Sequence, residues 1–244
     1  MFPISDDNPR SGTPYVTWGL IGACVLVFLW ELSLSDQGLK VALYRYGAVA
    51  AQLTGTGQQG VGTPPDWSTL VTSMFLHGGV AHIAGNMLYL WIFGDNVELA
   101  MGRVRFFIFY IVCGIAAALA QIWMSPASTF PLIGASGAIS GVLGAYLLLY
   151  PWGRVRVLIL PFPIIIIRVI EVPAMLVLGF WFALQLLSGI FSNPGEPGVA
   201  FMAHVGGFMA GMALVLVARQ PGVPLFERSR PRSPWSRRRR GPWG

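Results

Sequence analysis

The sequence predicts an all-α membrane protein in which six transmembrane helices pack as a bundle. Hydrophobic residues make up 55% of its 244 positions and charged residues only 11%, whereas soluble domains typically carry about 25% charged residues. Polar side chains this scarce cannot cover a globule, so we expect the bilayer to be the solvent of the protein. The first apolar stretch follows no charged segment with a small-residue cleavage site, so we expect no cleaved signal peptide.

Six apolar stretches approach the roughly 20 residues that a membrane-spanning helix needs. They cover residues 15–34, 78–96, 104–124, 136–150, 173–191 and 200–218. The sequence therefore predicts three regions: a cytoplasmic N-terminal segment (1–14), one helical domain (15–218) and a basic, disordered cytoplasmic tail (219–244).

Two connections between these stretches are unusual. Residues 35–77 are long and moderately apolar and contain Gly and Pro, which predicts an external loop lying partly in the membrane interface. Residues 157–170 are apolar but interrupted by Pro161 and Pro163. Proline disrupts a regular helix, so we expect an interfacial connection on the cytoplasmic side and no further span.

The distribution of basic residues predicts the orientation. Six spans place both termini on one side, and that side carries 14 of the 16 Lys and Arg residues, eight of them in the tail. The opposite side carries only Lys40 and Arg45. The positive-inside rule then places both termini in the cytoplasm. We expect the basic tail to face acidic membrane lipids and, because no nucleic-acid-binding motif accompanies it, we expect no nucleic-acid partner.

The fourth stretch is short and begins with a serine. It runs from Ser136 to Pro151, which as a helix is about 22 Å long, against a hydrocarbon core of about 30 Å. We therefore expect Ser136 to lie several ångströms below the external surface. Free N–H groups at a helix N-terminus can stabilise an oxyanion there. An ordinary N-cap serine is the alternative.

Two stretches carry small residues at every fourth position, which places them on one helix face. They are Gly137, Gly141 and Ala145 on the fourth stretch and Ala203, Gly207 and Gly211 on the sixth. Faces of this kind allow two membrane helices to approach closely. Ser136 and His204 each adjoin the first small residue of a stripe, so packing of the stripes would bring them to similar depth. A serine within hydrogen-bond reach of a histidine is the minimum for an activated nucleophile.

The second stretch carries His82 and Asn86, which are four residues apart and therefore on one helix face. Polar groups inside membrane spans are costly, so each is a functional candidate. Both could donate hydrogen bonds to a tetrahedral intermediate, or they could serve only in hydrogen bonds between helices. Since the spans offer no obvious carboxylate as a third member, we expect a serine–histidine dyad.

Together these residues resemble the rhomboid family of intramembrane serine proteases, over about residues 15–218. Three motifs occur in the order of the family. His77, followed by His82 and Asn86, is similar to the second-helix pattern; Gly134-Ala135-Ser136-Gly137 is similar to the GxSG nucleophile motif; Ala203-His204-Val205-Gly206-Gly207 is similar to the AHxxG base motif.

The resemblance implies a six-helix bundle around a water-filled cavity, with neither a metal nor a cofactor. It implies that Ser136 attacks the peptide carbonyl, that His204 accepts its proton, and that His82, Asn86 and the Ser136 N–H form the oxyanion site. The long first loop and the fifth helix, around Trp181 and Phe182, would border the path of the substrate. The residues expected to give structural support are His77, Gly134, Gly137, Gly207 and Gly211.

One departure from the family pattern concerns the base. Many relatives carry a tyrosine one turn after the nucleophile, stacked on the histidine, and this sequence has Ser140 there. The resemblance therefore does not assign the group that orients His204.

We expect a serine endopeptidase that cuts single-span transmembrane proteins near the external face of a membrane. Its location is expected to be a bacterial plasma membrane, which it crosses several times. One alternative is an inactive relative that binds membrane proteins. Another is a small transporter, which would show inverted repeats; the sequence shows none to inspection. The sequence does not predict the oligomeric state.

Overall fold

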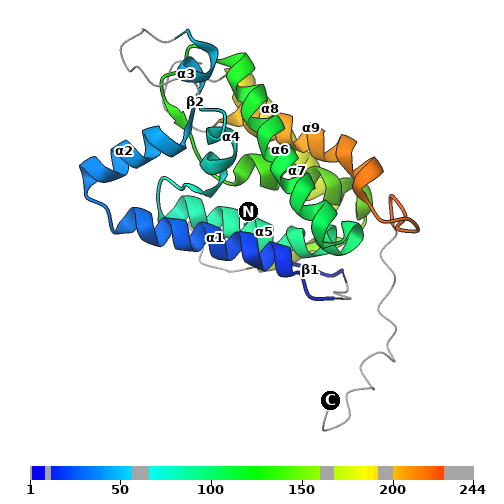
Figure 1. The fold of residues 1–244 in the computed structure, drawn as a ribbon. Helices are drawn as coiled ribbons and strands as arrows, with labels where there is room; N and C mark the ends of the chain where they lie inside the picture. Colours follow the sequence, from blue (N-terminus) through cyan, green and yellow to red (C-terminus); the bar gives the residue numbers. More distant parts are fainter. Residues whose placement is uncertain (1, 9–11, 57–65, 160–167, 192–199, 228–244) are drawn as a thin grey trace.

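A helix occupies each of the six apolar stretches in the computed structural model, which describes residues 2–8, 12–56, 66–159, 168–191 and 200–227 (Figure 1). These helices are α1 (Tyr15–Leu32), α5 (Val80–Met101), α6 (Arg103–Met124), α7 (Ser136–Leu149), α8 (Ala174–Phe191) and α9 (Phe201–Ala218). The other helices are short: α2 (Asp36–Tyr46), α3 (Ala50–Thr54), α4 (Thr69–Thr72) and the 3₁₀ helix η1 (Ser73–Phe75).

Four of the helices, α1, α6, α8 and α9, are long and apolar enough to cross a membrane. Helix α7 is apolar but has only 14 residues, and α5 is long but buries polar residues such as Asn86 and Asp95. The protein is therefore a mostly helical integral membrane protein.

Helix α7 lies at the centre of the bundle and packs against α5, α6, α8 and α9. Its closest neighbour is α9, and the glycines on the facing small-residue faces of the two helices explain why they approach so closely. A Cβ atom on Gly207 would overlap the backbone of Gly137, and one on Gly211 would overlap the backbone of Gly141. The two backbones are thus in direct contact along the faces that the small-residue spacing predicts.

The all-α prediction needs a correction, because two small antiparallel sheets accompany the helices. One sheet has the order β1-β4-β5 and consists of β1 (Phe2–Asp6), β4 (Arg154–Ile159) and β5 (Arg168–Pro173); the other pairs β2 (Ala48–Val49) with β3 (Pro131–Leu132). Strand β4 shows the period of two typical of a strand with one buried face. Val155 and Val157 are buried and alternate with exposed Arg154 and Arg156. The described part of residues 157–170 is thus extended, and no helix spans it.

The prediction of a disordered tail from residue 219 also needs a correction at its start. Gln220 N–H donates to the Ala100 carbonyl at 2.8 Å, and Phe226 N–H donates to the Leu148 carbonyl at 2.7 Å. Carbonyls at helix C-termini lack partners within the helix, so this segment satisfies groups at the ends of α5 and α7. Residues 228–244 lie outside the described part of the chain.

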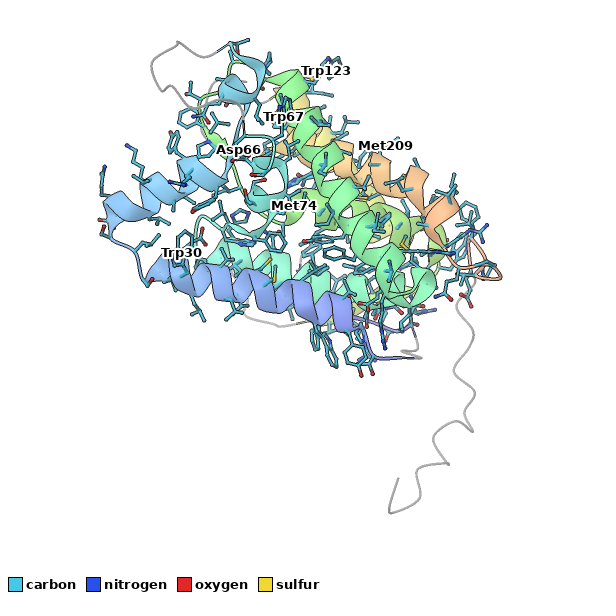
Figure 2. The ribbon with its side chains drawn as sticks, viewed as in Figure 1. Trp30, Asp66, Trp67, Met74, Trp123 and Met209 are labelled. Carbon is cyan, nitrogen blue, oxygen red and sulfur yellow. The ribbon has the colours of Figure 1, made fainter. Side chains whose placement is uncertain are left out.

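The two ends of the bundle differ in composition. At one end, the described arginines include Arg103 and Arg105 at the start of α6, and Arg105 donates to the Arg219 carbonyl beyond α9. The other end carries α2, α3 and α4, which replace the predicted loop over 35–77 with short helices. Exposed Trp67 and Trp123 lie at that end (Figure 2), as is typical of side chains at a membrane–water interface.

Candidate active site

Ser136 and His204 are in hydrogen-bond contact. Ser136 is the first residue of α7 and His204 lies in the first turn of α9. The Ser136 Oγ and His204 Nε2 atoms are 2.8 Å apart, and His204 is buried. The contact of the α7 and α9 backbones at Gly137 and Gly207 sets this distance. A hydroxyl that contacts an imidazole nitrogen can act as an activated nucleophile.

Helix α8 contacts the other side of His204. The Gln185 Oε1 atom lies 2.7 Å from His204 Nδ1, and the Trp181 ring lies 5.9 Å from the imidazole, inclined by 35°. Ser140, at the position of the family's tyrosine, instead donates its hydroxyl to the Ser136 carbonyl at 2.6 Å. Gln185 was not among the predicted site residues, although a polar residue in an apolar helix was a usable signal.

His82 and Asn86 face the turn that leads into α7. Gly134 in this turn has a φ of +114°, a region that favours glycine. A Cβ atom on Gly134 would lie 2.8 Å from His82 Nε2 and 3.6 Å from Asn86 Nδ2. Glycine at this position therefore allows the backbone next to Ser136 to approach both side chains.

The same two side chains can present hydrogen-bond donors to this turn. The Asn86 Nδ2 atom is buried and has no hydrogen-bond partner among the described residues. Gly78 N–H donates to His82 Nδ1 at 3.3 Å, so a neutral His82 carries its hydrogen on Nε2, on the side of Gly134. With the free N–H groups at the start of α7, these donors form a site that can bind a negatively charged oxygen.

His77 lies in the connection before α5 and links α1 to His82. Its backbone N–H is 3.2 Å from both carboxylate oxygens of Glu31, and its ring centroid lies 5.2 Å from that of His82. Burial, together with the nearby His82, lowers the pKa of His77 to about 4. His77 is therefore neutral at neutral pH, and its position is consistent with the supporting role that the sequence predicts.

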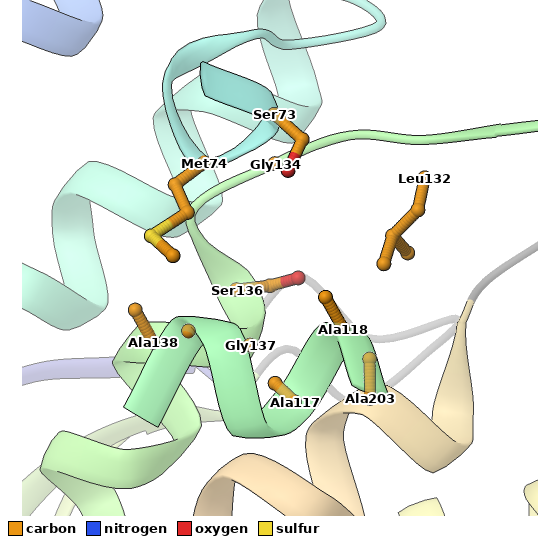
Figure 3. Close-up of a pocket in the computed structure, with 11 residues that line it drawn as sticks. Ser73, Met74, Ala117, Ala118, Leu132, Gly134, Ser136, Gly137, Ala138 and Ala203 are labelled. Atoms are coloured by element: carbon orange, nitrogen blue, oxygen red, sulfur yellow. The ribbon is translucent and has the colours of Figure 1, made fainter. Parts of the chain in front are cut away.

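A small pocket adjoins Ser136 (Figure 3). Its volume is about 20 Å³, and its wall includes Ala117, Ala118, Leu132 and Ala203. A space of this size accommodates about one water molecule or methyl group. Within the described ranges, no three His, Cys, Asp or Glu side chains lie together as a set of metal ligands.

Comparison with known proteins identifies the family of this chain. The family model described as Rhomboid domain matches residues 64–221. Rhomboid protease GluP of Bacillus subtilis is 34% identical over 209 residues, which cover 85% of this chain and 36% of that protein. Rhomboid protease AarA of Providencia stuartii is 31% identical over 223 residues, covering 85% and 73%.

Rhomboid protein 1, mitochondrial, of Saccharomyces cerevisiae is 33% identical over 154 residues, which cover 61% of this chain and 40% of that protein. The chain thus spans well under half the length of GluP and of the yeast protein. Because the domain model covers more than half of the sequence, the chain belongs to the rhomboid family.

Proposed function

We propose that the protein is an intramembrane serine protease with Ser136 as the nucleophile and His204 as the general base. The observation that carries this proposal is the 2.8 Å distance between Ser136 Oγ and His204 Nε2, in a chain of the rhomboid family. The GluP and AarA relatives are named as rhomboid proteases, which supports the same reaction class.

In the proposed reaction, Ser136 Oγ attacks the carbonyl carbon of the peptide while its proton passes to His204 Nε2. The carbonyl oxygen becomes an oxyanion, which accepts hydrogen bonds from His82, Asn86 and the Ser136 N–H. His204 then donates its proton to the leaving amine, and an acyl-enzyme forms at Ser136. A water molecule, deprotonated by His204, hydrolyses this ester and restores the serine.

We further propose that the helices of all six apolar stretches span the membrane, with both termini in the cytoplasm. The arginines at one end of the bundle support this orientation, and the exposed Trp67 and Trp123 support a membrane–water interface at the other end. Helix α7 has 14 residues and is about 21 Å long, so Ser136 would lie below the external surface. A bacterial plasma membrane is the proposed location; GluP and AarA come from bacteria, whereas other relatives are mitochondrial or chloroplastic.

The proposed substrate is a single-span transmembrane protein whose helix is weak near its external end. Peptide carbonyls within a helix are hydrogen-bonded, so the scissile segment must be extended when it reaches Ser136. Gly or Pro near the site would lower the cost of unwinding. The pocket of about 20 Å³ beside Ser136 favours a small residue such as Ala before the cut.

Two other functions remain to be tested against this one. An inactive relative that binds membrane proteins would not need a serine and a histidine in contact, as they are here. A small transporter would carry a solute along polar groups, but the polar groups beside Ser136 converge on one turn, at Gly134.

Labelling with a serine-reactive fluorophosphonate distinguishes the protease from the other two functions. We expect the probe to modify Ser136 of the purified protein, as located by peptide mass spectrometry. Ser136→Ala should abolish the label and His204→Ala should reduce it strongly, because the base is lost. Ser33→Ala, which removes an exposed hydroxyl at the end of α1, is the control and should keep the label. A folded wild-type protein that is not labelled would favour a binding protein or a transporter.

A further inference from the structure

We propose that Gln185 is the positioning residue of the base: it sets the tautomer and the ring orientation of His204. This inference rests on the proposed function, because the base role of His204 is part of that function. It also supplies the group that orients His204 in a chain with Ser140 at the position of the family's tyrosine.

The first step of the argument is the direction of the hydrogen bonds. The Gln185 Oε1 atom, 2.7 Å from His204 Nδ1, is an acceptor only. His204 Nδ1 must therefore carry the hydrogen and donate it. The neutral ring then has a lone pair on Nε2, which accepts the hydroxyl hydrogen of Ser136. The opposite tautomer would place N–H on Nε2, and that nitrogen could not accept a proton from Ser136.

The second step is the orientation of the ring. Gln185 restrains the imidazole through Nδ1, while Trp181, four residues earlier and on the same face of α8, lies against the ring at 5.9 Å. Trp181 also contacts Phe208 of α9 at 6.2 Å. Both restraints on the base thus come from α8, not from the helix that carries Ser136.

The third step concerns how α8 is held. Its fully buried residues are Ala174 and Leu178, both in its first half. Of the apolar segment of α8, 17% is buried, against 44% for α6. Gln185 and Trp181 lie beyond Leu178, in the half without a fully buried anchor. A displacement of this half would separate Gln185 from His204.

The tautomer can be read directly by nitrogen NMR. The chain has only three histidines, so protein labelled with ¹⁵N-histidine gives few ring signals, and the spectrum of His204→Ala assigns those of His204. At neutral pH we expect a protonated Nδ1 and an unprotonated Nε2 in the wild type. Gln185→Leu should shift His204 toward the Nε2–H form. Gln185→Glu keeps an acceptor and should restore the wild-type pattern.

Kinetics provides the second readout. We expect Gln185→Leu to lower kcat about 10²–10⁴-fold, the usual contribution of a correctly protonated general base, with little change in KM. Gln185→Glu should recover most of this loss. Leu184→Ala is the matched control, since it shortens an exposed neighbour on α8 and should leave both the tautomer and kcat unchanged.

An Nε2–H tautomer in the wild type would overturn the inference, as would a Gln185→Leu protein that keeps the Nδ1–H form. The wild-type spectrum suffices if the leucine variant does not fold. Because the spectrum needs no substrate, it separates this inference from the proposed function. Absence of proteolysis with the expected tautomer would count against the protease alone, whereas proteolysis with the opposite tautomer would count against the role of Gln185 alone.

Discussion

Helices α9 and α8 both hold the candidate base His204, but they are packed to different extents. Helix α9 carries His204 and touches the backbone of α7 through Gly207 and Gly211. Helix α8 carries Gln185 and Trp181 but is mostly exposed, with fully buried residues only in its first half. In the proposed mechanism, the close α7–α9 interface sets the distance between nucleophile and base, whereas the less buried α8 sets the orientation of the base. Position and orientation can therefore be altered separately.

The largest effect should come from separating α7 and α9. A Cβ atom on Gly211 would overlap the Gly141 backbone, so Gly211→Ala forces the two helices apart. Overpacking typically costs about 1–3 kcal/mol, and more against rigid backbone, so we expect a clear fall in the thermal unfolding midpoint and loss of cleavage. Gly179→Ala on α8 is the matched control, because its Cβ meets open space and a helix prefers alanine. Equal midpoints for the two variants would contradict the comparison.

The next effect concerns the candidate hydrogen-bond donors His82 and Asn86 on α5, a helix that packs against α7. Asn86→Ala should lower kcat about 10²–10³-fold, as expected for loss of one oxyanion donor. Its unfolding midpoint should change little, since Nδ2 has no partner among the described residues. Asn96→Ala on the same helix is the control: this amide donates to Asp6 at 2.8 Å, so its loss should mainly lower stability. The reverse pattern would assign Asn86 to packing.

A smaller effect concerns the pocket beside Ser136, whose wall includes residues of the closely packed helices. Because these backbones cannot easily separate, a larger side chain should not fit the volume of about 20 Å³. We expect a substrate with Leu before the cut to show a kcat/KM at least about 10-fold below that of the Ala substrate, the lower range for discrimination by a few methylene groups. Equal values would show that this pocket does not receive that residue.

The smallest effect is a pH dependence of stability at His77, outside the contact between Ser136 and His204. Burial lowers the pKa of His77 from 6.5 to about 4, so between these values the unfolded chain binds the additional proton. Stability therefore falls as the pH decreases through this window. Between neutral pH and pH 5, the unfolding midpoint of the wild type should fall more than that of His77→Gln. Equal falls would exclude this contribution.

The difference between α9 and α8 also explains which contacts of the site the sequence could predict. The α7–α9 contact depends on glycine spacing, which is a local and periodic signal, so the proximity of Ser136 and His204 could be expected from it. His82 and Asn86 are four residues apart on one helix, so helical periodicity likewise places them on one face. The role of α8 depends on a single glutamine, and periodicity says nothing about which neighbouring group one polar side chain will contact.

The sheet was missed for a different reason. Strand β1 pairs with β4 across about 150 positions, with Phe2 opposite Leu158, and a pairing at that separation leaves no local pattern. The start of the tail was likewise missed, because its hydrogen bonds to Ala100 and Leu148 depend on where distant helices end.

Cleavage of a single-span substrate, with the cut located by mass spectrometry, tests the central claim most directly. The wild type should cut near the external end of the substrate helix, whereas Ser136→Ala and His204→Ala should show no cleavage while remaining folded. The double variant should be no worse than either single one, because residues that act as a unit are not additive. Normal turnover by the Ser136→Ala protein would contradict the mechanism, and a cut at the cytoplasmic end would contradict the proposed orientation.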